Sequence, residues 1–184
     1  MRRLAAALVH YPVLDRQGAI VTTAITNLDL HDIARSAHTY GLSDFFVIHP
    51  VAAQRELAER VREHWTLGSG ARRIPDRTPA MRGVTVVETL EDAVGALGGN
   101  VELWTTSAQV RERSVSHAEA RARLAGDGAP VMLTFGTGWG LAEAVYSRAD
   151  AHLDPIVSLR SDGYNHLSVR AAAAILFDRL CGAR

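Results

Sequence analysis

The chain of 184 residues contains no lysine, so all 20 of its basic side chains are arginine. Schiff-base catalysis and the phosphate-binding P-loop both depend on a lysine, and both are therefore excluded. No stretch approaches the roughly 18 consecutive apolar residues that a membrane-spanning helix requires. Cys181 is the single cysteine, which excludes an intrachain disulfide and is typical of a reducing compartment.

The formal net charge is zero, because 20 acidic residues balance the arginines. A globally basic nucleic-acid binder is therefore excluded, whereas local basic clusters are not. The segment MRRLAAALVHYPVL resembles a secretory signal only briefly, because its apolar run from Leu4 to Val9 is short and is interrupted by His10. We expect a cytoplasmic protein that does not enter a membrane.

The order of the apolar segments predicts the fold class. Short apolar runs alternate with longer helical patterns, which indicates one α/β domain over 1–184, with a mainly parallel sheet and helices on both faces. The expected strands are 4–9, 45–48, 84–87, 101–105 and 131–135. The expected helices are 28–40, 51–65, 90–97, 116–124, 141–148 and 167–180, and the segment 68–83 is expected to be irregular.

The helix expected over 28–40 has one apolar face, and Thr26 or Asn27 can cap its start. Its outward stripe carries His31, Arg35 and His38 at spacings of four and three. An arginine in this position can bind a phosphate in bidentate fashion or stabilise a developing oxyanion. A solvated polar stripe is the commoner meaning of such a pattern, and the spacing alone does not decide between them.

The segment TFGTGWGLAE, residues 134–143, places a glycine-rich loop between an apolar strand and a helix. Loops at the carboxyl edge of such a sheet hold ligands, and glycine allows a ligand to approach the backbone closely. A dinucleotide fingerprint would require a third glycine where Leu141 stands, so that match is weak. The alternative is a turn that serves only to reverse the chain.

Two further segments carry polar groups. In the segment 154–175, Asn165 or Ser168 can cap the alanine-rich last helix, which we expect to be buried in the core or in a subunit interface. The segment 68–83 holds four arginines that face only Asp76, and it is either an RNA phosphate-binding surface or a solvated loop. These arginines are Arg72, Arg73, Arg77 and Arg82.

Several catalytic patterns are missing. The eight histidines form no H-E-x-x-H motif and no cluster with the cysteine, so we expect no metal site. No G-x-S-x-G elbow is present, which argues against an α/β-hydrolase.

Five segments together resemble the SPOUT superfamily of S-adenosylmethionine-dependent RNA methyltransferases, and more closely a bacterial family of predicted RNA methyltransferases within it. They are ALVHYPV, TTAITNLDLHDIARSAHTYG, AQRELAERVREHWTLGSGA, LTFGTGWGLAEAV and YNHLSVRAAAAI. The resemblance covers nearly the whole chain and keeps the order of the motifs. It implies a cytoplasmic enzyme that uses S-adenosylmethionine to methylate a nucleoside in structured RNA, either tRNA or rRNA.

The resemblance also implies the site residues. The first motif places Asn27 and Arg35 near the target nucleotide, and His31 or His166 is a candidate proton acceptor. Loops after three strands would hold the cofactor, largely through backbone groups. Their residues are Thr106, Ser107, Phe135, Gly136, Thr137, Gly138, Trp139, Gly140, Ile156, Tyr164, Asn165, Leu167 and Ser168.

The resemblance further implies a deep trefoil knot near the C-terminus and a homodimer with its active site at the interface. The branch that methylates the ribose 2′-oxygen usually carries a glutamate in the second motif and an asparagine after the leucine of the third. This chain has the shorter GTGWG and Ser168, so the resemblance does not extend to 2′-O specificity. Two alternatives remain: a non-catalytic RNA-binding module with the same fold, and a dinucleotide-binding α/β enzyme.

Overall fold

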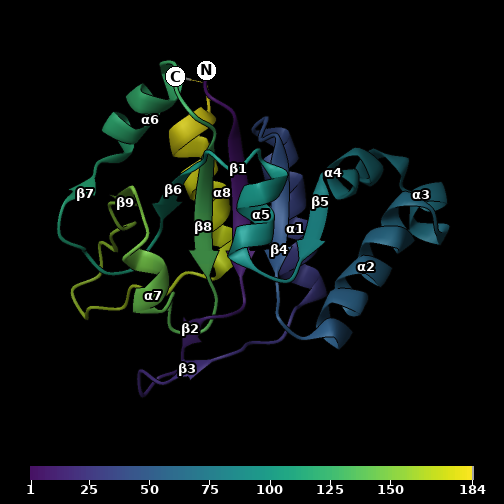
Figure 1. Ribbon diagram of the computed structural model, residues 1–184, viewed down its shortest axis with the longest axis horizontal. Helices are drawn as coiled ribbons and strands as arrows, with labels where there is room; N and C mark the ends of the chain where they lie inside the picture. The colour runs from purple at the N-terminus through teal and green to yellow at the C-terminus, as the bar shows by residue number, and fades with distance from the viewer. Residues whose placement is uncertain (184) are drawn as a thin grey trace.

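The computed structural model describes residues 1–183, so the end of the domain expected over 1–184 lies outside it. A seven-stranded sheet has the order β5-β4-β1-β8-β6-β9-β7, and its neighbouring strands are parallel (Figure 1). Its strands are β1 (Leu4–Val9), β4 (Asp44–Ile48), β5 (Val84–Val87), β6 (Glu102–Thr105), β7 (Ser114–Val115), β8 (Val131–Gly136) and β9 (Ala151–Leu153).

Helical segments connect these strands. They are α1 (Asn27–Thr39), α2 (Ala52–Thr66), α3 (Ser69–Arg73), η1 (Pro75–Arg77), α4 (Thr78–Arg82), α5 (Leu90–Ala96), α6 (His117–Ala125), α7 (Glu143–Tyr146) and α8 (Val169–Cys181). A separate antiparallel ribbon joins β2 (Val13–Leu14) to β3 (Ile20–Val21). No helix among the described residues is long and apolar enough to cross a membrane.

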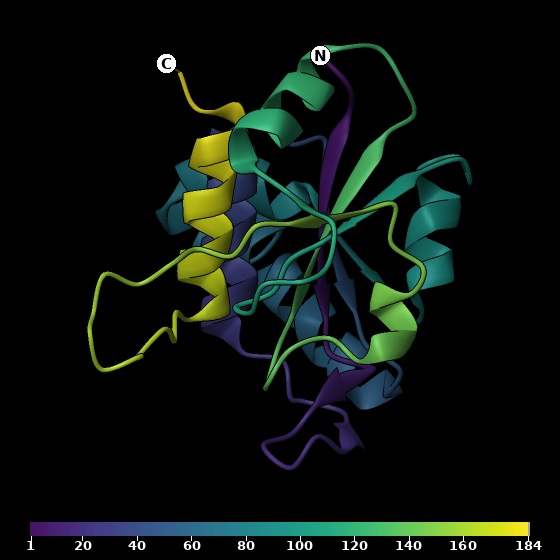
Figure 2. The same cartoon turned by 90° about the vertical axis from the view of Figure 1, so that its left-hand side faces the viewer.

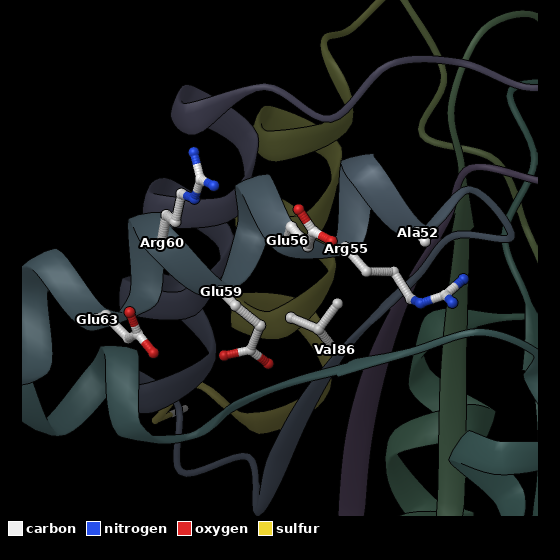
Figure 3. A pocket seen from close by; sticks show the side chains of 7 residues that line it. All are labelled: Ala52, Arg55, Glu56, Glu59, Arg60, Glu63 and Val86. Atoms are coloured by element: carbon white, nitrogen blue, oxygen red, sulfur yellow. The ribbon is translucent and has the colours of Figure 1, made fainter.

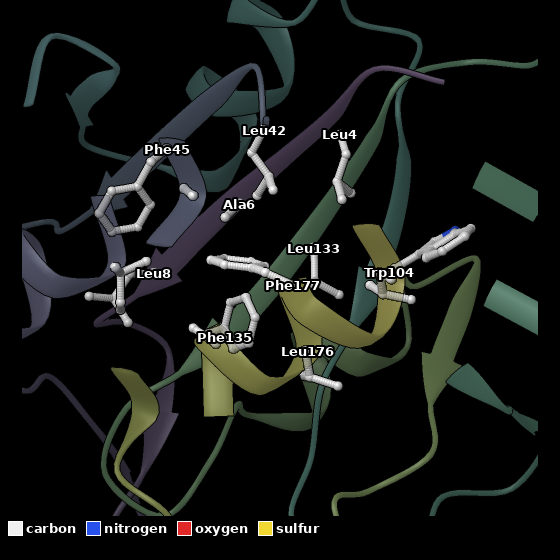
Figure 4. Close-up of a cluster of buried hydrophobic side chains, with 14 of the residues drawn as sticks. Leu4, Ala6, Leu8, Leu42, Phe45, Trp104, Leu133, Phe135, Leu176 and Phe177 are labelled. Atoms are coloured by element: carbon white, nitrogen blue, oxygen red, sulfur yellow. The ribbon is translucent and has the colours of Figure 1, made fainter. Parts of the chain in front are cut away.

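Both faces of the sheet are buried, because alternate residues of β1 pack into two separate cores. On one face, α1 and α8 lie side by side over the strands, together with α6 (Figures 1 and 2). Phe135 and Phe177 meet edge-on in this core, with ring centroids 5.7 Å apart (Figure 4). Apolar side chains of α5 and α7 cover the opposite face, as the alternation of segments predicts.

The segment 68–83, expected to be irregular, instead folds into α3, η1 and α4. Pro75 and Pro79 are compatible with this because each stands in the first turn of its helix, where a missing backbone N–H costs nothing. Helical segments this short also carry no readable apolar period. The prediction of an irregular loop is therefore wrong.

The helix expected over 141–148 is confined to α7, because Leu141 forms an isolated bridge to Val13 of the ribbon before the helix begins. The caps of the longer helices agree with the sequence. Thr26 caps α1 by accepting a hydrogen bond from the Asp29 amide, and Ser168 caps α8. Gly41 follows α1 with a φ of +74°, the conformation typical of a helix C-terminus.

Parallel strands place their carboxyl ends at one edge of the sheet, and the functional loops lie there. The chain leaves β1 for β4 on one side, while β8 and β6 lie on the other side of β1. A change of direction of this kind opens a crevice at the carboxyl ends of the strands. The β2–β3 ribbon lies below the same edge in Figure 1.

Candidate active site

Loops after β6 and β9 are joined at the carboxyl edge of the sheet. The hydroxyl of Thr106 donates a hydrogen bond to the Thr134 carbonyl at 2.9 Å, which fixes the loop after β6 against β8. Asn165 donates from Nδ2 to the Ala108 carbonyl at 3.3 Å, which brings the segment after β9 to the same loop. Ser107 accepts from the amide two residues later and closes the turn.

The loop after β8 completes this arrangement. The indole of Trp139 meets the imidazole of His166 edge-on, with ring centroids 5.8 Å apart. The phenol ring of Tyr164 also lies near that imidazole, with centroids 6.4 Å apart. The structure therefore brings the three expected cofactor loops together, although they come from distant parts of the sequence.

The glycines of the loop after β8 are required by the packing of the chain on itself. A Cβ at Gly136 would lie 2.7 Å from the Leu141 amide nitrogen. Gly138 has a φ of +60°, and its Cβ would lie 2.8 Å from the Leu14 carbonyl oxygen of the ribbon. Gly140 has a φ of +109°, which disfavours any other residue. Contacts within the protein therefore fix the shape of this loop. Such a fixed loop is compatible with ligand binding and also with a turn that serves only to reverse the chain.

A chain of hydrogen bonds joins this loop to β1. Thr137 donates from Oγ1 to the Val9 carbonyl at 3.2 Å, and its hydroxyl is in close contact with that of Thr23. His10 Nδ1 lies 3.0 Å from the Thr23 hydroxyl. Because the Thr137 proton is used by Val9, Thr23 must donate to Thr137 and His10 must donate to Thr23. Neutral His10 therefore carries its proton on Nδ1.

His10 is buried completely, and its Nε2 has no hydrogen-bond partner within residues 1–183. Burial lowers the pKa of His10 to about 4, and the neighbouring His49 lowers it as well. His49 donates from Nε2 to the Thr23 carbonyl at 2.9 Å and accepts at Nδ1 from the Val51 amide. Burial lowers the pKa of His49 too. Both imidazoles are therefore neutral supports of the site at pH 7.

Between residues 155 and 167 the Arg160 and Tyr164 amides bond to side chains of the same segment, and the other backbone groups are open. In the described part of the chain, none of them hydrogen-bonds to another backbone group. The segment is held at its end by Ser168, whose hydroxyl accepts from the Ala171 amide at 3.3 Å. Free amides and carbonyls suit the edge of an adenine ring and a ribose. The donor and acceptor set of the three loops therefore fits an adenosyl group.

Other expected cofactor residues differ in their exposure. Phe135 is 2% exposed and lies in the core beneath the loop, so it supports the loop and is sealed from any ligand. Ile156 is half-buried and packs on the same core. Leu167 and Tyr164 are exposed beside α8.

The first turn of α1 adjoins the start of α8. Arg170 donates from Nη1 to Asp29 Oδ1 at 3.0 Å, which connects the two helices. Asn27 opens α1 and is exposed at this place. Arg35 lies two turns further, about 12 Å along the helix axis, and is also exposed. Within one protomer, Asn27 therefore lies near the loops and Arg35 does not.

His31 lies between helices. Its ring packs on Trp65 of α2 with centroids 5.2 Å apart, and its Nδ1 lies 3.4 Å from Asp32 Oδ1. Burial lowers the pKa of His31. The structure therefore places this candidate proton acceptor against α2, whereas His166 lies at the three loops.

Arg77 and the helix α4, which carries Arg82, lie near α1, whereas Arg72 and Arg73 lie on α3, which packs on α2. The guanidinium carbon of Arg77 lies 4.7 Å from the centre of the Trp65 ring, the same ring that contacts His31. Arg72, Arg73 and Arg82 are exposed. A basic surface therefore borders α1, with Arg77 anchored by a cation–π contact.

Two hollows of the surface lie elsewhere. One of about 580 Å³ follows α2 and β5, and Figure 3 shows that its charged side chains all come from α2. It is lined by Ala52, Arg55, Glu56, Glu59, Arg60, Glu63 and Val86, none of them an expected site residue. A second hollow of about 630 Å³ adjoins the loop after β6, between Arg111, Glu143 and His152.

Sequence reasoning missed the support beneath the site. In the sequence, His10 only interrupts an apolar run, and Thr23 is only part of a longer motif. A buried histidine beside a polar residue gives no readable spacing. The contact between Thr23 and Thr137 joins residues 114 positions apart, so only the folded chain reveals it.

Comparison with known proteins identifies the family. The model of the SAM-dependent RNA methyltransferase family matches residues 3–182. A tRNA (guanine-N(1)-)-methyltransferase from Nitratidesulfovibrio vulgaris is 45% identical over 184 residues, which cover 98% of this chain but 42% of that protein. An uncharacterized protein from Aquifex aeolicus is 34% identical over 178 residues, covering 95% of this chain and 86% of the relative. The chain spans less than half the length of the first relative.

Solved structures agree in fold. TrmJ from Z. mobilis superposes with a TM-score of 0.61 at 14% identity, covering 100% of this chain and 70% of the other. The SpoU methyltransferase AviRb from Streptomyces viridochromogenes gives 0.57 at 16% identity, covering 97% and 58%. The chain thus shares the fold of these methyltransferases. The chain therefore belongs to the SAM-dependent RNA methyltransferase family, whose methyl donor is S-adenosylmethionine.

Proposed function

We propose that residues 1–184 form one cytoplasmic methyltransferase domain that methylates a nucleoside in structured tRNA or rRNA. The convergence of the three loops at the carboxyl edge of the sheet carries this proposal, because it joins open backbone groups to exposed polar side chains. The guanine-N1 activity named for the Nitratidesulfovibrio vulgaris relative belongs to a protein more than twice as long. The methylated atom is therefore left open.

The three loops would hold the cofactor mainly through their backbone. S-adenosylmethionine supplies an activated methyl group that a nucleophilic oxygen or nitrogen can accept. Thr106 and Ser107 would bind on one side, the loop Gly136–Thr137–Gly138–Trp139–Gly140 on another, and Ile156 to Ser168 on the third. The glycine loop after β8 is shaped by its contacts with the β2–β3 ribbon. It is therefore preorganised and needs no rearrangement to bind the cofactor.

Polar side chains would then position the RNA and accept a proton. Asn27 would orient the target nucleoside at the start of α1, and Arg35 would bind a phosphate or the ribose. His166 would accept the proton that the nucleoside loses when its new bond to carbon forms. His31 is the alternative acceptor, and its place against Trp65 favours His166.

The exposed arginines beside α1 would bind RNA phosphates. Arg72, Arg73 and Arg82 are exposed, and Arg77 is fixed on Trp65. Phosphate contacts of this kind position an RNA without reading its sequence. The neutral net charge of the chain makes such a local cluster the main electrostatic attraction for RNA.

We also propose a homodimer and a trefoil knot in the segment that leads to α8. Ala171, Ala172, Ala174 and Ile175 form a half-exposed apolar face of α8, which suits a partner helix. In a dimer, Arg35 of one protomer would reach the cofactor loops of its partner. This arrangement would explain how Arg35 acts at a site although it lies away from the loops of its own chain. A monomer in sedimentation at micromolar concentration would contradict the dimer and the shared site.

Substitution of Arg35 tests the assignment. The Arg35→Ala variant should keep its affinity for S-adenosylmethionine in calorimetry and lose methyl transfer to bulk RNA. Arg60→Ala is the matched control, because Arg60 is an exposed arginine of the helix α2 and lies outside the predicted site. This variant should retain activity. Full activity of Arg35→Ala would remove this arginine from the site. Cofactor binding by the wild-type protein without any methyl incorporation would instead indicate a non-catalytic RNA-binding module.

A further inference from the structure

Two large aromatic side chains are exposed where the cofactor loops meet. Trp139 is 58% exposed and Tyr164 is 62% exposed. The ring of His166 contacts both of them, edge-on to the indole at an interplanar angle of 84° and tilted by 34° to the phenol. We refer to Trp139, Tyr164 and His166 as the aromatic platform. Clustered exposed apolar rings of this kind mark a binding surface.

The backbone beneath both exposed rings is held in place. The Trp139 amide donates to the Leu14 carbonyl at 2.9 Å, which ties its loop to the ribbon. The Tyr164 amide donates to Asp162 Oδ1 at 3.0 Å and closes a turn. Because both side chains remain more than half exposed, aromatic surface of Trp139 and Tyr164 is open to solvent. The platform is thus preorganised for stacking.

We propose that the aromatic platform stacks an unpaired base of the RNA substrate beside the target nucleoside. This inference rests on the proposed function and adds a substrate class, namely a nucleotide in a loop, bulge or single-stranded end. Every base offers a π-face, but within a duplex both faces are covered by neighbouring base pairs. Exposed rings beside a methyl-transfer site therefore select unpaired RNA over duplex RNA.

Charge on the neighbouring ribbon supports an RNA occupant. Arg16 lies two residues after Leu14, whose carbonyl binds the Trp139 amide. Its side chain is exposed, and within residues 1–183 the structure gives its guanidinium no hydrogen-bond or ion-pair partner. A free guanidinium on the ribbon that holds the Trp139 loop can bind an RNA phosphate. An apolar protein partner would leave this charge without a counterpart.

Binding of two labelled RNAs to the full chain tests the proposal. Fluorescence anisotropy is measured with a single-stranded RNA of mixed sequence and with the same strand in a duplex. Trp139→Leu should weaken binding of the single strand roughly 5- to 160-fold, the range for loss of one stacked base. It should leave duplex binding unchanged. Trp139→Phe retains a ring and should recover most of the affinity.

Leu159→Ala is the matched control, because Leu159 is fully exposed in the same segment as Tyr164 and carries no ring. Its affinity for the single strand should equal that of the wild type. Equal single-strand affinity of wild type and Trp139→Leu would overturn the proposal. So would loss of cofactor affinity with unchanged RNA binding, which would make Trp139 a wall of the cofactor pocket. Neither measurement requires methyl transfer, so failure of the proposed function is detected separately by absence of transfer.

Discussion

Acid should destabilise the protein through His10, and the structure gives the size of the effect. His10 is fully buried with Nε2 unpartnered, and its pKa is lowered from 6.5 to about 4. Between these two pH values, His10 therefore binds a proton in the unfolded chain but not in the folded state. The neutral ring contributes its full stability above pH 6.5, and this stability is lost as pH falls, until the loss levels off below about pH 4. Between pH 7 and pH 5 the loss is about 2 kcal/mol.

The assay is urea unfolding at pH values from 7 to 4.5. Other histidines and the carboxylates also titrate in this range, so the comparison needs a variant without the His10 charge. His10→Asn retains a side-chain N–H that can donate to the Thr23 hydroxyl and carries no titrating group. Its free energy of unfolding should be lower than that of the wild type at pH 7. The difference between them should shrink by about 2 kcal/mol at pH 5.

Parallel pH profiles for the wild type and His10→Asn would refute this reasoning. They would mean that His10 binds its proton in the folded state as readily as in the unfolded chain. Its Nε2 would then have a partner, or water would reach the ring.

Three further predictions concern the supports of the site. Gly138→Ala should cost roughly 1–3 kcal/mol in urea unfolding because of its positive φ and the close ribbon carbonyl, whereas Gly18→Ala, with a positive φ but open space, should cost less. Ser168→Ala should cost about 1 kcal/mol through loss of the α8 cap, with Ser168→Asp restoring most of it. Arg170→Met should destabilise by about 1–3 kcal/mol because Asp29 is left buried without its cation. Equal unfolding midpoints for Gly138→Ala and Gly18→Ala would contradict the contact at Gly138. An unfolding midpoint equal to that of the wild type for Ser168→Ala or Arg170→Met would contradict the cap or the ion pair, respectively.

The main strands and long helices were predictable because local patterns dictate them. The continuous apolar run LAAALV is typical of a strand buried on both faces, and its residues divide between the two cores. The helix α1 has an apolar face and a threonine cap at its start. Such features involve residues a few positions apart, so a single sequence reveals them.

Short elements and distant contacts were not predictable in this way. The strand β9 has three residues, too few for a period, and the helices that begin at Pro75 and Thr78 look like loops in sequence. The resemblance predicts the three cofactor loops and their order along the chain. It does not predict that the β2–β3 ribbon shapes the glycine loop. Leu14 and Gly138 are distant in sequence, and the pairing of β1 with β8 brings the segments that follow these strands together.

The central claim is methyl transfer to RNA at this site. The most direct measurement incubates the full chain with methyl-labelled S-adenosylmethionine and RNA from cells that lack the gene, followed by mass spectrometry of the nucleosides. We predict label in one modified nucleoside, at a position unpaired in the folded RNA, and no label with the Arg35→Ala variant. Absence of label from RNA, with the cofactor bound to the protein, would contradict the account.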